Sequence, residues 1–148
     1  MLSLKGQAAV LVGGAGSIGS ATALLLSELG AGIVICDQDE AAAGNLKVKL
    51  DAAGRHCDML VLDGCDDKKV GAAAASIAQK CGRIDILVHL LGGSVARHLL
   101  DTDMENVRQD IERNLTSAVL WAKATLPQMM KQRSGVMLFC SSVNTRLG

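Results

Sequence analysis

Short apolar runs alternate along this chain with longer segments in which apolar residues recur every three or four positions. The first pattern is typical of strands buried on both faces, and the second of helices that cover them. The apolar runs predict strands at Gln7–Val12, Gly32–Cys36, His56–Leu62, Ile84–Leu91 and Gly135–Cys140. The periodic segments predict helices at Ser17–Leu29, Asp39–Ala53 and Asp66–Cys81, and a region of one or two helices at Asp103–Lys131.

The alternation of strand and helix predicts an α/β fold. We expect a single domain, residues 1–148, built on a doubly wound, Rossmann-like parallel sheet of about five strands. Turn signals agree with the boundaries, since Asp39 can cap the second helix and Gly82 ends the third. With right-handed crossovers and a reversal of strand order between strands one and four, the ligand crevice should lie over Gly13–Gly19 and His89–Ser94.

Composition narrows the classes of function. Hydrophobic residues make up 49% of the chain and only Phe139 and Trp121 are aromatic, so aliphatic residues and Met must fill the core. Lys plus Arg equal Asp plus Glu at 15 each, and no basic patch indicates nucleic acid. No apolar run is long enough for a membrane span, and no signal-peptide pattern opens the chain. We expect a cytoplasmic protein that binds neither nucleic acid nor membrane.

The cysteines lack the spacing of metal ligands. Cys36, Cys57, Cys65, Cys81 and Cys140 form no Cys-x-x-Cys pair, and the three histidines do not complete a ligand set with them. Free thiols in a reducing cytoplasm are the expected state. We predict no metal site.

The segment after the first predicted strand carries the strongest chemical signal. Residues Gly14–Gly19 read Gly-Ala-Gly-Ser-Ile-Gly, a Gly-x-Gly-x-x-Gly pattern. Such glycines let backbone approach a pyrophosphate closely, and the helix that begins there directs its free N–H groups at the anion. Glycines also make ordinary turns, but the place of these between a strand and a helix favours dinucleotide binding. The predicted cofactor-binding residues in this turn are Gly13, Gly16, Ser17, Ile18 and Gly19.

Two aspartates at strand ends extend this prediction. Asp37 lies 18 residues after Gly19, where a carboxylate can accept hydrogen bonds from the adenosine ribose hydroxyls. It would repel a 2′-phosphate, and Gln38 supplies no cation, so we expect NAD rather than NADP. Asp63 could accept a hydrogen bond from the adenine amino group. In the alternative interpretation, both aspartates only form turns.

On these motifs the chain resembles the N-terminal part of a short-chain dehydrogenase/reductase, and the resemblance covers essentially its whole length. The glycine turn, Asp37 and Asp63 match the family. Three further matching segments are Arg83–Val88, which resembles the fourth strand of the family, Asn114–Ala118 with Leu126–Met129 at the family's spacing, and Gly135–Val143.

The resemblance implies roles at matching positions. Asn114 would sit at a helix bend and hold a water in the proton relay, and Gly92 would join the cofactor-binding residues. Ser142, directly before Val143, would orient and polarise the substrate carbonyl, with Ser141 the less favoured candidate. From the residues alone, Asn114 could instead relieve strain inside a helix, and Ser142 could satisfy backbone groups at a strand end.

The chain also departs from the family pattern. Val12 stands where the family usually has Thr, and Ser17 where it often has Gly. Residues His89–Gly92 read His-Leu-Leu-Gly, whereas the family has Asn-Asn-Ala-Gly. The first Asn ties neighbouring strands together in the family, and we expect His89 to replace that hydrogen bonding. We expect Leu91, in place of Ala, to crowd the ribose–nicotinamide side of the crevice.

The family's Tyr-x-x-x-Lys motif, whose Tyr is the general acid/base, would fall beyond Gly148, and this chain contains no Tyr. We therefore expect the chain alone to be inactive. Val136–Cys140 should form an exposed apolar edge that a cleaved remainder, a second chain or a longer polypeptide covers. The resemblance implies a subunit interface on the helix that carries Trp121, although periodicity places Trp121 itself in the core.

Two functions follow from this sequence. The first is an NAD-dependent oxidoreductase that moves a hydride between nicotinamide and a secondary alcohol or ketone, with this chain as the nucleotide-binding part of a homo- or hetero-oligomer. The alternative is a non-catalytic, dehydrogenase-like subunit that binds a nucleotide or stabilises a partner, which Val12, His89–Leu91 and the lack of Tyr favour. A methyltransferase also has a glycine loop after its first strand, but Asn114 and Ser142 do not fit that class.

Overall fold

A computed structural model describes residues 2–94 and 98–142. Its strands form one parallel sheet in the order β3-β2-β1-β4-β5. The strands are β1 Ala8–Val12, β2 Gly32–Asp37, β3 Cys57–Val61, β4 Ile86–His89 and β5 Val136–Phe139. The strand order reverses between β1 and β4, as predicted, and the doubly wound parallel sheet is confirmed.

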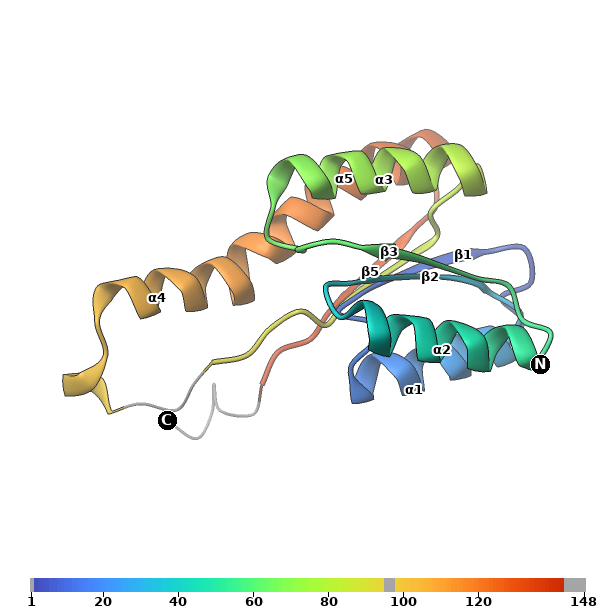
Figure 1. The fold of residues 1–148 in the computed structure, drawn as a ribbon. Coiled ribbons are helices and arrows are strands. Elements are labelled where there is room, and N and C mark those ends of the chain that lie inside the picture. Colours follow the sequence, from blue (N-terminus) through green and yellow to red (C-terminus); the bar gives the residue numbers. More distant parts are fainter. Residues whose placement is uncertain (1, 95–97, 143–148) are drawn as a thin grey trace.

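Helices cover both faces of this sheet (Figure 1). Helices α1 (Ser17–Glu28) and α2 (Glu40–Ala52) lie on one face, and α3 (Asp67–Cys81) and α5 (Ser117–Gln132) lie on the other. Helix α4 (Met104–Ile111) follows a 3-10 turn, Leu99–Asp101, and projects away from the sheet. A π-helical turn, Glu112–Thr116, joins α4 to α5. The predicted long helical region is therefore two helices with an irregular turn between them.

Successive strand residues pack against opposite helical layers, which explains the near-continuous apolar runs of the sequence. On β1, Leu11 packs in one buried cluster with Ala23 of α1. Its neighbour Val10 packs in a second cluster with Ile77 of α3 and Trp121 of α5. Trp121 is fully buried, so the prediction that it belongs to the core is confirmed.

The helix starts agree closely with the sequence. The carboxylates of Asp39, Asp66 and Asp103 accept hydrogen bonds from N–H groups three residues ahead, at 2.9, 3.1 and 2.7 Å. Such caps satisfy amides that have no acceptor within the helix. Gly82 ends α3 in the left-handed region, with φ 72°. Local signals thus determine these boundaries.

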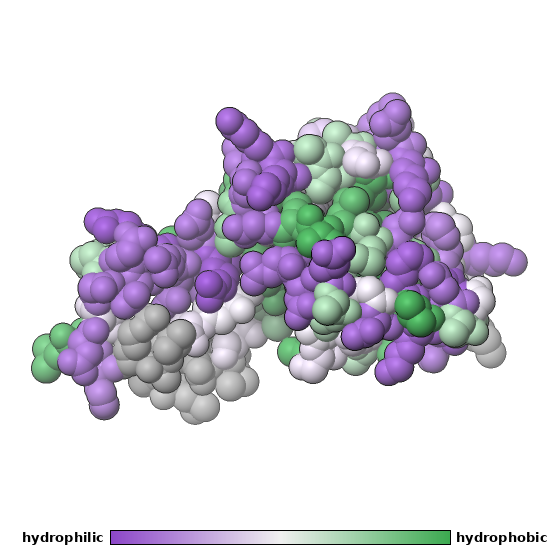
Figure 2. Space-filling model, in the orientation of Figure 1, coloured by the Kyte–Doolittle hydropathy of each residue, from purple (hydrophilic) through white to green (hydrophobic). Residues whose placement is uncertain are grey.

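Strand β5 is the exposed apolar edge that the sequence predicts. The side chains of Val136 and Leu138 are 57% and 56% exposed. Together with Leu26 of α1 and Leu90 they line an apolar hollow of about 650 Å³ on the α1 side of the sheet. Elsewhere, Figure 2 shows hydrophilic side chains over the outer faces of the helices and apolar surface between the sheet and the α3–α5 layer.

Candidate functional site

The glycine turn lies where β1 ends, beside the reversal in strand order. Gly13 has φ 70°, and its N–H donates to the carbonyl of Cys36 at 2.9 Å. A Cβ on Gly19 would lie 2.5 Å from the carbonyl oxygen of Gly14, so α1 packs directly on the turn. A Cβ on Gly16 would meet only the carbonyl oxygen of Gly13, at 3.7 Å. The fold itself therefore needs glycine at 13 and 19, whereas the space beside Gly16 is open.

The start of α1 can bind an anion. Gly16 is the N-cap and offers no side chain, and the first turn carries no acidic residue. Ser17 and Ile18, the first two residues of the helix, are exposed. Because the first N–H groups of a helix lack acceptors within it, this end presents donors and positive dipole charge. The predicted pyrophosphate position thus has the electrostatics that the ligand requires.

Asp37 joins the end of β2 to the glycine turn. Its Oδ2 accepts a hydrogen bond from the N–H of Ala15 at 2.9 Å, and its Oδ1 accepts one from the N–H of Asp39 at 3.1 Å. Asp37 therefore does form a turn, and its binding of a ligand stays a prediction. Each carboxylate oxygen has a second lone pair, so Asp37 retains the capacity to accept from ribose hydroxyls.

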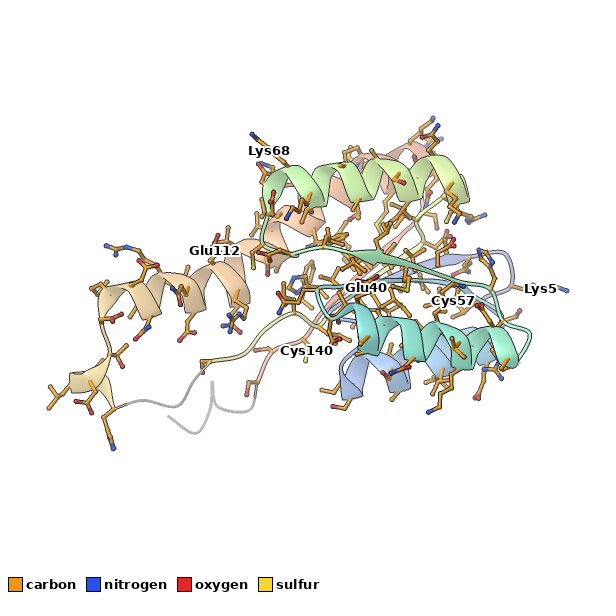
Figure 3. The ribbon with its side chains drawn as sticks, viewed as in Figure 1. Lys5, Glu40, Cys57, Lys68, Glu112 and Cys140 are labelled. Atoms are coloured by element: carbon orange, nitrogen blue, oxygen red, sulfur yellow. The ribbon has the colours of Figure 1, made fainter. Side chains whose placement is uncertain are left out.

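Asp63 lies beside Asp37 at the same end of the sheet. Its Oδ1 accepts from the N–H of Cys65 at 3.0 Å, which forms the turn after β3. Asp37, Gln38 and Asp63 line one small hollow over the ends of the strands. In Figure 3, Glu40, Glu112 and Cys140 lie toward this end of the sheet and Lys5 lies at the opposite end. The structure thus brings together the turn and both aspartates.

Leu91 packs at the edge of the crevice, beside the turn that follows β3. A Cβ on Gly64 would lie 2.9 Å from Leu91 Cδ2, and Leu91 packs against the buried cluster that contains Trp121. Trp121 Nε1 also donates to the carbonyl of Gly64 at 3.2 Å. The side chain of Leu91 turns toward this apolar cluster. It lines the same small hollow as Asp37 and Asp63, and the expected crowding of the ribose–nicotinamide side stays a prediction.

Asn114 lies in the π-helical turn, so the predicted helix bend is present. Its Oδ1 accepts from the N–H of Gly93, and its Nδ2 donates to the carbonyls of Gly93 and Asp110, each at 2.8 Å. The bond to Asp110 satisfies a helix carbonyl, as the strain-relief interpretation requires. The pair of bonds to Gly93 clamps the loop after β4 and was not foreseen from the sequence. A Cβ on Gly92 would lie 2.9 Å from Asn114 Oδ1, so this clamp requires glycine there.

The side chain of His89 forms its hydrogen bond to a helix rather than to a neighbouring strand. It lies two residues after Leu87 and therefore on the α5 face of the sheet, where its Nε2 is 3.1 Å from Ser117 Oγ. Its ring also tilts against Phe139 with 6.0 Å between centroids. Burial lowers the pKa of the His89 imidazole. We expected His89 to hydrogen-bond to a neighbouring strand, and this prediction is wrong. The alternation of side chains along β4 directs His89 to the helix, where its partner is Ser117.

The predicted substrate-orienting serine follows β5, the neighbour of β4. The N–H of Cys140 donates to the carbonyl of His89 at 3.1 Å, which keeps the two strands paired up to this point. Ser141 and Ser142 come next and are exposed. Val143, which distinguishes Ser142 in the family pattern, lies outside the described residues. Ser142 therefore follows the end of β5, Asn114 contacts the loop that follows the adjacent β4, and the roles of both stay predictions.

Within residues 2–94 and 98–142 no helix is long and apolar enough to cross a membrane. The same residues contain no group of three or more His, Cys, Asp and Glu side chains that could hold a metal ion.

Comparison with known proteins decides the family. Residues 7–148 match the short chain dehydrogenase family. The chain belongs to the short-chain dehydrogenase/reductase family. The resemblance inferred from the glycine turn and the segments around Asn114 and Ser142 is thus confirmed.

Individual relatives show how much of such a protein this chain spans. It is 35% identical to tropinone reductase-like 2 of Erythroxylum coca, over 97% of this chain and 53% of that protein. It is 32% identical to 2,3-dihydroxy-2,3-dihydro-p-cumate dehydrogenase of Pseudomonas putida, over 99% and 57%. The chain therefore spans little more than half the length of these curated short-chain dehydrogenase/reductase relatives.

Solved structures agree on the fold. The solved structure of a 7α-hydroxysteroid dehydrogenase complexed with NADH and 7-oxo glycochenodeoxycholic acid superposes with a TM-score of 0.94 at 27% identity, over 98% of this chain and 57% of the other. The five-stranded sheet and its helices thus have the arrangement of the N-terminal part of this family.

Proposed function

We propose that this chain is the nucleotide-binding part of an NAD-dependent oxidoreductase that transfers a hydride between nicotinamide and a secondary alcohol or ketone. The observation that carries the proposal is the carboxylate of Asp37, which the N–H of Ala15 holds against the glycine turn. A fixed negative charge there accepts bonds from ribose hydroxyls and repels a 2′-phosphate. The solved family member that binds NADH supports a nicotinamide nucleotide.

The residues of the crevice fit such a cofactor. The open space beside Gly16 admits a pyrophosphate to the N-terminus of α1, with Gly13, Ser17, Ile18 and Gly19 forming the cradle. Asp63 accepts from the adenine amino group, and Gly92 keeps the loop after β4 close to Asn114. When bound, NAD supplies the hydride acceptor. Asn114 would hold a water of the proton relay, and Ser142 would orient the substrate carbonyl.

Removing the charge of Asp37 tests the nucleotide preference. Asp37→Asn keeps an oxygen that can accept from Ala15 but removes the repulsion of a 2′-phosphate. We expect the ratio of the Kd for NADP to that for NAD to fall about tenfold, in line with the loss of one charged interaction. Isothermal titration with both nucleotides measures the ratio.

The matched control is Asp39→Asn, which removes a carboxylate two residues away that caps α2. It should leave the nucleotide ratio unchanged. NADP binding tighter than NAD in the unmodified chain, or no NAD binding at millimolar concentration in a folded chain, would contradict the proposal.

The alternative function is a non-catalytic subunit, and the position of Leu91 favours it. Leu91 lines the same hollow as Asp37 and Asp63, where it reduces the room for adenosine. Hydride transfer to NAD from a panel of secondary alcohols, measured on the complete polypeptide, distinguishes the two. Turnover supports the oxidoreductase, and NAD binding without turnover supports the alternative.

We also propose that the protein is an oligomer, with an interface on the outer face of the α4–α5 region, and that it resides in the cytoplasm. Leu115, Val119, Leu126 and Met130 are 45–68% exposed along this region. Apolar patches of this kind mark association surfaces. Sedimentation velocity should show the average mass rising with concentration, and a monomer at every concentration would contradict this prediction.

A further inference from the structure

The loop after β4 is joined to the π-helical turn at two points. Asn114 binds both backbone groups of Gly93, and His89, at the end of β4, meets Ser117, the first residue of α5. Only residues 90–92 separate the two contacts along the loop after β4, and only residues 115–116 separate them along the helical segment. This segment includes Leu91 and Gly92, which belong to the proposed cofactor crevice.

The π-helical turn depends on side chains for its hydrogen bonds. The N–H of Ser117 donates to the carbonyl of Glu112, five residues back, so the carbonyl of Arg113 loses its ordinary helical donor. The hydroxyl of Ser117 replaces that donor and reaches Arg113 O at 2.6 Å. Ser117 is fully buried, and its hydroxyl lies between the carbonyl of Arg113 and the ring of His89.

The hydrogen bonds of Ser117 favour one tautomer of His89. A serine hydroxyl has one hydrogen, and Ser117 donates it to Arg113. The 3.1 Å contact with His89 then needs the hydrogen on Nε2 of the ring, so that the imidazole donates and the hydroxyl oxygen accepts. His89 is 2% exposed, and burial favours the neutral ring. We therefore expect the hydrogen of the ring on Nε2, where it can be donated to Ser117 Oγ.

We propose that His89 is a positioning residue for the cofactor crevice. By donating from Nε2 to Ser117, it holds the π-helical turn in the register in which Asn114 clamps Gly93. The Gly92–Gly93 loop and Asn114 are thereby kept in place at the end of β4. The effect on nucleotide affinity rests on the proposed NAD function, whereas the clamp itself does not.

The tautomer can be tested in the unmodified protein. In ¹⁵N NMR spectra of the imidazole at neutral pH, Nε2 of His89 should have the shift of a protonated nitrogen and Nδ1 that of an unprotonated one. A hydrogen on Nδ1 instead, or a ring protonated on both nitrogens, overturns the proposal. This measurement needs no variant and therefore does not depend on whether a substitution disturbs folding.

The positioning role is tested with three variants and one control. His89→Phe and Ser117→Ala remove the donor and the acceptor, and His89→Gln returns an N–H donor at a similar reach. Thr125→Val removes another buried hydroxyl of α5, one that bonds within its own helix. Amide exchange at Gly93 and at the Asn114 side chain, together with the Kd for NAD, are the measurements.

We expect exchange at both groups to accelerate at least about tenfold, and the Kd for NAD to rise about tenfold, in His89→Phe and Ser117→Ala. In His89→Gln, the exchange rates and the Kd for NAD should return most of the way to those of the unmodified protein. Thr125→Val should change neither the exchange rates nor the Kd. Unaltered exchange at Gly93 and Asn114 in folded His89→Phe and Ser117→Ala overturns the proposal. If the unmodified protein does not bind NAD, the proposed function fails, while tautomer and exchange still decide the role of His89.

Discussion

Alanine at Gly16 is expected to weaken NAD binding roughly ten- to a hundredfold while changing the free energy of unfolding by less than about 1 kcal/mol. In the protein, the added methyl group meets only Gly13 O, at an ordinary van der Waals distance of 3.7 Å. Alanine is a weaker N-cap than glycine, but it also restricts the unfolded chain, and these effects offset each other. We therefore expect Gly16→Ala to weaken NAD binding and not folding, because the pyrophosphate must approach this backbone.

Gly19→Ala should lose binding for a different reason. Its methyl group would lie 2.5 Å from Gly14 O and 2.6 Å from Gly14 Cα, so the turn or the start of α1 has to move. Overpacking of this kind costs roughly 2–3 kcal/mol of folding stability. Urea unfolding and NAD titration of both variants distinguish a blocked ligand from a distorted turn.

Gly71→Ala is the matched control for this pair. Gly71 lies in the interior of α3 with nothing within 4 Å of an added Cβ, so alanine there should stabilise the chain by about 0.5–1 kcal/mol and leave the Kd for NAD unchanged. Normal NAD binding by Gly16→Ala would show that no ligand occupies the space beside Gly16, and the assignment of the pyrophosphate would be wrong.

Asp85→Ala is expected to lower the free energy of unfolding by about 3 kcal/mol. Asp85 is 5% exposed and accepts hydrogen bonds from the N–H of Ala8 at 2.9 Å and from two nitrogens of Arg83 at 2.6 Å. Removing the carboxylate leaves a buried β1 amide without its acceptor. We place the cost at the low end for buried ion pairs because Arg83 is 47% exposed and water can solvate it.

The carboxylate of Asp85 should also make the free energy of unfolding depend on pH in the acid range. Burial by itself would raise the pKa of Asp85, but the bonds from Arg83 and Ala8 lower it below its ordinary value of 3.8. The unfolded chain therefore takes up the proton first as the pH falls. The stabilisation is complete well above pH 3.8 and is lost as the pH falls below that value toward the folded-state pKa.

Urea unfolding of the unmodified chain, Asp85→Ala and Asp85→Asn between pH 7 and pH 3 tests both points. Asp85→Asn can still accept from Ala8 but cannot form the ion pair, so its stability should fall less at pH 7 and vary less at acid pH. Asp58, whose pKa is also lowered, should leave some acid dependence in both variants. Equal stability of Asp85→Ala and the unmodified chain at pH 7 would contradict the role assigned to this carboxylate.

The amino-acid sequence by itself determined the elements and the family of this protein. Apolar runs and helical periodicity placed all five strands within a few residues, and Asp39, Asp66 and Gly82 marked helix ends that the structure confirms. The glycine turn was also recognisable, because its pattern lies within Gly13–Gly19. Each of these signals acts between residues close together in the chain, so a short stretch of sequence contains all of it.

Tertiary structure alone decided the partners of the side chains in the crevice. His89 bonds to Ser117, 28 residues away, and Asn114 bonds to Gly93, 21 residues away. Leu91 packs against the cluster that contains Trp121 and lines one hollow with Asp37 and Asp63. Ser117 was missed as a functional residue, although its place three residues after Asn114 was visible. These contacts depend on how β4, the π-helical turn and α5 meet, because a one-residue change of hydrogen-bond register within a helix leaves no periodic signal in the sequence.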